Sequence, residues 1–65
     1  MLDDDSLASD RLKGVPEIAR FLGEPERKTY WLLHNSYIPA GKLGATWIAS
    51  KTKLRQYFDR ITGEV

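Results

Sequence analysis

The stretch "VPEIARFLGEPERKTYWLLHNS", residues 15–36, contains two helix patterns separated by a glycine. Apolar residues of the first pattern recur at the three- and four-residue spacing of one helix face, which predicts a helix over residues 16–22. Gly23 then ends this helix, because glycine adopts the left-handed backbone of a helix C-terminus without strain. Pro25 suits the first turn of a second helix, predicted over residues 25–35. Two short helices joined by such a tight turn form a helix-turn-helix pattern.

The second predicted helix has two chemically different faces when its residues are placed at intervals of about 100°. Thr29, Leu32 and Leu33 share one arc, which we expect to pack on the core. The opposite and flanking positions carry cations and large rings: Arg27, Lys28, Tyr30, Trp31 and His34. Aromatic rings beside basic residues on a water-facing surface indicate a contact surface. The structural alternative is that Trp31 packs under the N-terminal segment or the last helix.

Beyond the second helix the pattern changes from helix to strand. Strand-forming residues interrupted by glycine and proline predict two short strands, over residues 38–43 and 46–49, paired across Gly44-Ala45. Ser50 is a good N-cap for a last helix, predicted over residues 51–61. An isolated hairpin is only marginally stable in water, so we expect this one to pack on the helices.

The predicted order of elements is helix, turn, helix, hairpin, helix, which is a mainly α fold with a small β-hairpin. The side chains expected in its core come from every element and follow the apolar periodicity of each. They are Val15, Ile18, Leu22, Thr29, Leu32, Leu33, Ile38, Leu43, Trp47, Leu54, Phe58 and Ile61. This set would form a minimal core for a winged helix-turn-helix.

Charge is distributed unevenly along the chain. Residues 1–10 contain four aspartates and no basic residue, whereas residues 11–62 contain all 10 lysines and arginines and carry a net charge of +6. We interpret residues 1–12 as an acidic, disordered leader, residues 13–62 as the winged helix-turn-helix domain and residues 63–65 as a tail. An alternative is that the leader competes with a polyanion for the basic face of the domain.

The composition argues against several functional classes. The chain has no cysteine and one histidine, so neither a disulfide nor a zinc site is expected, and no other cofactor is indicated. No serine or carboxylate stands at a spacing from His34 that indicates a catalytic triad, and no glycine-rich phosphate motif is present, so we do not expect an enzyme. No apolar run approaches the roughly 20 residues of a membrane span, and no signal-peptide core is visible, so we expect a cytoplasmic protein.

Residues 15–58 resemble, without a gap, the excisionase-like, MerR-type small DNA-binding domains. The matching positions are Leu22-Gly23, Tyr30 before Leu32-Leu33, Ile38-Pro39-Ala40, Lys42, Gly44, Trp47, and Leu54 with Tyr57-Phe58. Two positions differ from the pattern of that family. Pro25 stands in place of its capping serine, and Thr46 stands in place of its arginine after the glycine turn.

The resemblance implies a winged helix-turn-helix that places its second helix in the major groove of duplex DNA. The hairpin, called the wing in that family, would lie against the neighbouring backbone or the minor groove. The resemblance further implies a phage- or mobile-element-type regulator, or a recombination directionality factor, associated with the nucleoid. The expected protein partners are further copies of the chain on DNA, or a recombinase or transcription partner.

The side chains on the outer face of the second helix suit such a complex. Arg27 can make a bidentate contact to guanine, and Lys28 is suited to a phosphate. Tyr30 can donate its hydroxyl to a phosphate, while the ring of Trp31 can press against a thymine methyl group or a sugar edge. Protonated His34 can also bind a phosphate.

Two further candidates, Lys42 and Thr46, flank the tip of the hairpin. They either contact phosphate from the wing or form an ordinary polar edge, where lysine protects against edge pairing. The rival interpretation of the whole scaffold is a protein–protein interaction module that uses the face of Tyr30, Trp31 and His34. This rival has a physical basis, because tryptophan, tyrosine and arginine are the usual anchors of protein interfaces.

Overall fold

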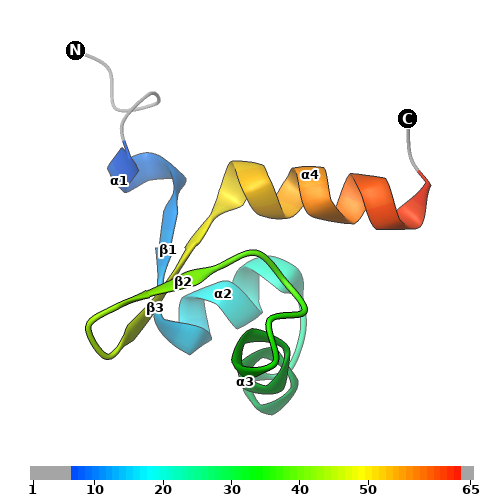
Figure 1. Cartoon of the computed structure of the whole chain (residues 1–65). Coiled ribbons are helices and arrows are strands. Elements are labelled where there is room, and N and C mark those ends of the chain that lie inside the picture. Colours follow the sequence, from blue (N-terminus) through cyan, green and yellow to red (C-terminus); the bar gives the residue numbers. More distant parts are fainter. Residues whose placement is uncertain (1–6, 64–65) are drawn as a thin grey trace.

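The structure, a computed structural model, describes residues 7–63 of the chain. These residues form a small α/β domain with three helices, one short helical turn and a three-stranded antiparallel sheet (Figure 1). Predictions for residues 1–6 and 64–65 lie outside this range. In chain order the elements are α1 (Leu7–Asp10), β1 (Arg11–Lys13), α2 (Gly14–Leu22), α3 (Glu26–His34), β2 (Gly41–Leu43), β3 (Thr46–Ser50) and α4 (Lys51–Thr62).

β3 is the central strand of the sheet, with β1 on one side and β2 on the other. Both pairings are antiparallel, and Leu12 of β1 lies opposite Ala49 of β3. β2 and β3 are joined through Gly44, whose φ of 67° suits a tight hairpin turn. The predicted hairpin is confirmed, but β2 is limited to Gly41–Leu43. The strand is shorter than expected because Pro39 has no N–H to donate to a strand ladder.

The coil predicted for residues 1–12 is wrong for residues 7–12, which form α1 and most of β1. Leu12 is buried, with 6% of its side chain surface exposed, and belongs to the core cluster. A strand of three residues is too short to show alternation, so its stability comes from pairing with β3 rather than from a local pattern. The sheet therefore has a third strand beside the predicted hairpin, and the domain boundary predicted at residue 13 falls at the end of β1.

α2 begins two residues before the predicted start of the first helix. Gly14 has a φ of 84°, a left-handed conformation that turns the chain from β1 into the helix. The Glu17 carboxylate accepts a hydrogen bond of 2.9 Å from the Lys13 N–H, which satisfies a donor left open at the helix start. Gly23 has a φ of 74° and donates to the Ala19 carbonyl over 2.8 Å, so the predicted glycine cap is confirmed.

α3 and α4 match the predicted helices to within one residue at each end. Thr29 of α3 is fully buried, and its hydroxyl donates to the Pro25 carbonyl over 2.9 Å, so the buried oxygen is satisfied. Ser50 caps α4 as predicted, since its Oγ accepts a hydrogen bond of 3.2 Å from the Lys53 N–H. No helix between residues 7 and 63 has the length and apolar character needed to cross a bilayer.

The core lies where α2, α3, α4 and the sheet meet. α2 packs against β1, β3 and α3, and α4 packs against β3 (Figure 1). Each of the three helices contributes one apolar side chain with at most 1% exposure, namely Ile18 from α2, Leu33 from α3 and Leu54 from α4. The other buried apolar residues are Leu12, Ala19, Ile38 and Ala49.

The predicted core is wrong at two positions. Leu43 is 67% exposed and Ile61 is 55% exposed. Leu43 lies at the end of β2 beside the hairpin turn, and Ile61 lies in the last turn of α4, which runs outward from the end of β3 (Figure 1). Five other predicted core residues are half-buried and pack against the core: Val15, Leu22, Leu32, Trp47 and Phe58.

Asp10 ties the first segment of the structure to the start of α4. One carboxylate oxygen accepts a hydrogen bond from the Ser50 hydroxyl. The other accepts from the Thr52 N–H at 3.0 Å and from the Thr52 hydroxyl at 2.8 Å. The hydrogen bonds from Ser50 and Thr52, which favour the ionised carboxylate, lower the pKa of Asp10 below its ordinary value of 3.8. Asp10 also places a negative charge at the positive end of the α4 dipole.

We expect Asp10→Ala to lower the melting temperature at neutral pH, and we expect this difference to shrink as the pH is lowered below about 4. The pKa of the Asp10 carboxyl is depressed in the folded state, so its contribution to stability is present above about pH 4. That contribution is lost as the pH falls through the folded-state pKa, because the carboxyl then binds a proton. Thermal unfolding of both proteins, followed by circular dichroism across this range, provides the measurement. An equal difference in melting temperature at both ends of the range would contradict the expectation.

Candidate functional site

The outer face of α3 is defined by what the helix buries on its inner face. Thr29 is fully buried and Leu33 is 1% exposed, which fixes the rotation of α3 on the core. The opposite side therefore turns to water, and the side chains of Tyr30 and Trp31 are 52% and 54% exposed. The predicted orientation of the helix is confirmed, and the alternative in which Trp31 packs under the last helix is wrong. Packing of Trp31 under residues 1–6 lies outside the described residues.

The exposed rings of this face are arranged in two stacked pairs. Tyr30 stacks on His34, with ring centroids 5.6 Å apart and planes at 15°. Trp31 stacks on Tyr37, with centroids 5.0 Å apart and planes at 27°. Such offset aromatic pairs contribute about 0.5–1.5 kcal/mol beyond the area they bury. Each ring is therefore held in place by its neighbour although it is exposed to water.

Tyr37 was not predicted as a site residue, and the end of α3 explains how it reaches Trp31. Ser36 has a positive φ of 60°, which reverses the chain after the helix. The Tyr37 N–H then donates to the Leu32 carbonyl over 2.9 Å, and the Ser36 N–H donates to the Leu33 carbonyl over 3.1 Å. This is the hydrogen-bond pattern of a Schellman motif, which turns the chain back over the last helical turn. The sequence contains no glycine here to signal it.

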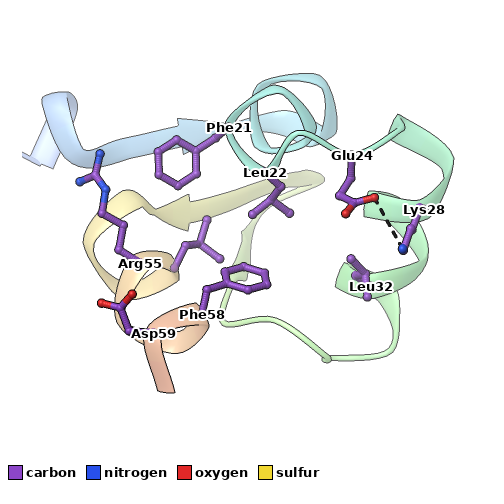
Figure 2. Close-up of a pocket in the computed structure, with 9 residues that line it drawn as sticks. Phe21, Leu22, Glu24, Lys28, Leu32, Arg55, Phe58 and Asp59 are labelled. Atoms are coloured by element: carbon purple, nitrogen blue, oxygen red, sulfur yellow. Dashed lines mark ion pairs between the residues drawn. The ribbon is translucent and has the colours of Figure 1, made fainter. Parts of the chain in front are cut away.

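A groove beside the α3 face, which shares Lys28 with that face, lies between α2, α3 and α4 and has a volume of about 550 Å³. Figure 2 shows apolar side chains from all three helices around it, with Glu24 and Lys28 at one end and Arg55 and Asp59 at the other. The Arg55 guanidinium lies over the ring of Phe21, 5.3 Å from its centroid. Charges of both signs border this groove, so it lacks the concentration of cations that attracts a polyanion.

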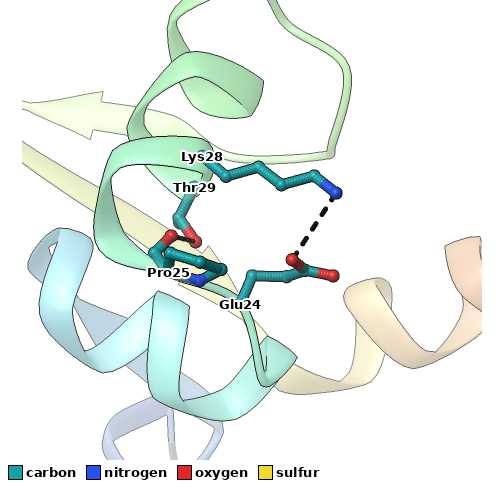
Figure 3. Close-up of polar contacts among 4 residues, drawn as sticks. All are labelled: Glu24, Pro25, Lys28 and Thr29. Atoms are coloured by element: carbon teal, nitrogen blue, oxygen red, sulfur yellow. Dashed lines mark hydrogen bonds and ion pairs between the residues drawn. The ribbon is translucent and has the colours of Figure 1, made fainter.

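The cations of the α3 face differ in their partners. Lys28 Nζ lies 3.6 Å from a carboxylate oxygen of Glu24, one helical turn earlier (Figure 3). Both side chains are exposed, so this pair contributes only about 0–1 kcal/mol and Lys28 can exchange Glu24 for another anion. Arg27 is also exposed, and it has no ion-pair partner among the described residues. Its guanidinium is therefore available to a ligand.

A shallow depression lies at the start of the same face. Pro25, Arg27, Lys28 and Trp31 line it. Pro25 precedes α3, and the other three residues fall within its first two turns. The depression therefore lies beside the side chains predicted to contact a ligand.

The two candidates on the hairpin lie apart from α3. Lys42 lies opposite Trp47 in the strand register, and its Nζ is 5.2 Å from the centroid of the Trp47 ring. Thr46 is exposed at the start of β3, opposite Leu43. In Figure 1 the hairpin turn and α3 both lie on the lower side of the view, with α4 on the upper side. The structure thus gathers five candidates on α3 and keeps Lys42 and Thr46 together on the hairpin.

The described part of the chain provides no group of histidine and acidic side chains that could hold a metal ion. The site is instead a protruding surface of exposed cations and stacked rings. Such a surface can bind a large anionic partner by contact, charge and hydrogen bonding. Comparisons with protein-family models, with curated proteins and with solved structures found no match for this chain.

Proposed function

We propose that this chain is a winged helix-turn-helix that binds duplex DNA in a sequence-specific manner through the outer face of α3. The hairpin β2–β3 acts as the wing and contacts the adjacent backbone. The observation that carries the proposal is the rotation of α3: Thr29 and Leu33 are buried while Arg27 and Trp31 face water. The resemblance of residues 15–58 to excisionase-like DNA-binding domains supports the same arrangement.

The size of α3 fits the major groove. The groove is about 12 Å wide and admits a helix of about 10–12 Å diameter. α3 has nine residues, a length of about 13 Å, which spans roughly four base pairs. Arg27 lies in the first turn of α3, and it supports bidentate recognition of guanine O6 and N7. Lys28, Tyr30 and His34 supply phosphate contacts along the edges of the groove.

The electrostatics favour DNA in spite of the acidic residues near the start of α3. Residues 11–62 carry a net charge of +6, which raises the association rate with a polyanion. Glu24 holds Lys28 through an exposed ion pair, and a phosphate can replace that carboxylate at small cost. Glu26 lies at the N-terminus of the helix, where a carboxylate is favoured by the dipole.

In biological terms the proposed role is that of a phage- or mobile-element-type regulator or a recombination directionality factor. This part of the proposal rests on the resemblance alone. A single module of this size reads a short site, so several copies on DNA, or a recombinase or transcription partner, would extend the recognised sequence.

The proposal is tested by titrating fluorescent random-sequence duplex with the protein between about 50 and 200 mM salt. We expect the equivalent of roughly three to six phosphate contacts, which corresponds to a slope of log affinity against log salt of about −2.7 to −5.4. Backbone amide resonances of residues 26–34 and 42–46 should shift on binding. Affinity that does not change with salt would contradict the proposal.

The rival function, a protein–protein interaction module, is favoured by the exposed stacked rings of Tyr30, Trp31 and His34. The same titration separates the two functions. If the protein does not bind duplex at 50 mM salt, the rival function is favoured, in which these exposed rings anchor a protein partner. Such a complex would persist at high salt and would be abolished by Trp31→Ala, because burial of the ring rather than charge would hold it.

A further inference from the structure

The depression at the start of α3 combines an apolar lining with a cationic rim. Its lining, from Pro25, Arg27, Lys28 and Trp31, is almost entirely apolar. The two charged residues therefore contribute mainly their aliphatic stems to the lining, and their heads remain in water at its edge. The depression is open and has a volume of about 540 Å³, so it can take an apolar group carried by a polyanion without steric conflict.

One wall of the depression is supported by a neighbouring ring. The indole of Trp31 stacks on Tyr37, with centroids 5.0 Å apart. Among the lining residues, Trp31 comes last in the chain, three to six positions after the others. Tyr37 is not a lining residue and follows the C-terminal end of α3. Tyr37 therefore supports the ring from beyond the depression, and the hydrogen bonds that close the turn at Ser36 hold Tyr37 in place. A preformed wall reduces the entropy lost when a ligand binds.

Duplex DNA offers few apolar groups to a helix in its major groove. The thymine C5-methyl is the apolar group that the bases display there, and it projects from the base edge into the groove. A sugar edge is the other apolar surface that Trp31 could meet, but it lies on the wall of the groove and is broad rather than projecting. A concave site between two cations is complementary to a methyl group of this kind, because Lys28 can meet a neighbouring phosphate while Arg27 contacts an adjacent guanine.

We propose that this depression binds the methyl group of one thymine and that Trp31 thereby determines part of the sequence specificity. This inference rests on the proposed function, since it requires α3 to lie in the major groove. Trp31 contacts the methyl group directly. Tyr37 is a positioning residue, because it acts through the indole.

The test uses a duplex enriched from a random-sequence pool by the full-length protein. Each thymine of that duplex is replaced in turn by deoxyuridine, which lacks only the methyl group. We expect one thymine at which the replacement weakens binding by about three- to tenfold, the effect of losing one buried methyl contact. In Trp31→Ala the thymine-to-uracil affinity ratio at that position should fall to about one.

Two variants make the test specific. Tyr30→Ala removes an exposed ring on the same face but outside the depression, so it should weaken binding and keep the ratio. Tyr37→Ala should lower the ratio while Trp31 remains present, and it provides a second test if Trp31→Ala does not fold by circular dichroism.

Equal binding of thymine and uracil at every position, or an unchanged ratio in both Trp31→Ala and Tyr37→Ala, would overturn the inference while DNA binding stands. Failure to enrich or bind any duplex would overturn the proposed function instead.

Discussion

Reversing both cations of α3, with Arg27→Glu and Lys28→Glu, is expected to weaken duplex binding by at least about 100-fold near 100 mM salt. A bidentate arginine–guanine contact contributes about 1–3 kcal/mol of discrimination, and each carboxylate introduced in its place also repels phosphate. The loss of the Lys28 phosphate contact should also reduce the magnitude of the salt slope by about one unit. Anisotropy titrations of labelled duplex at several salt concentrations measure both quantities.

A matched control separates a local contact from a general effect of net charge. Lys53→Glu with Arg60→Glu makes the same change in total charge on exposed positions of α4, which contributes no residue to the depression beside Arg27 and Lys28. We expect this variant to bind duplex within about fivefold of the unchanged protein, because it keeps the α3 contacts and salt weakens the effect of exposed charges that make no direct contact. Equal losses in the two double variants would mean that DNA is attracted by overall charge and that α3 is not the contact surface.

Leu54→Ala is expected to remove a large fraction of the free energy of unfolding. The Leu54 side chain is completely buried against the core cluster. Replacing a buried leucine with alanine typically lowers the free energy of unfolding by about 2–5 kcal/mol, through lost transfer energy and the cavity left behind. A chain of 65 residues has a total free energy of unfolding of only about 3–10 kcal/mol, so this change removes much of it. Urea unfolding followed by circular dichroism provides the measurement.

The chain offers the same substitution at an exposed position. Leu43→Ala should change the free energy of unfolding by no more than about 0.5 kcal/mol, since the Leu43 side chain is 67% exposed. A similar loss of stability in the two leucine variants would show that the position of the core described above is incorrect. The comparison is direct because both variants delete the same atoms.

The helices could be predicted because their signals are local. The apolar spacing around Ile18 and Leu33, and the caps at Gly23 and Ser50, all lie within a few residues of the elements they define. The outward orientation of Trp31 followed from the same helical spacing. These features needed no knowledge of distant segments, so the sequence alone placed them.

Features that depend on distant or unusual contacts were missed or wrong. β1 and the Asp10 hydrogen bonds join residues about 40 positions apart, and no periodic pattern marks them. Leu43 and Ile61 fit the apolar patterns of their elements, but they lie where those elements extend beyond the core. Tyr37 joins the candidate site only because Ser36 adopts a left-handed backbone, which a non-glycine residue rarely does.

β3 lies between β2, its neighbour in the sequence, and β1, which comes from the first part of the chain. This arrangement constrains how the domain forms during synthesis. Lys13 lies opposite Ile48, so the β1–β3 ladder closes a large loop, and the entropy of closing that loop opposes folding until the ladder and core contacts offset it. α2 and α3 can pair through local contacts as they leave the ribosome, but the sheet on which α2 packs is incomplete until β3 has emerged. Folding is therefore a late event, and the apolar sides of α2 and α3 stay open to chaperones or to aggregation for most of translation.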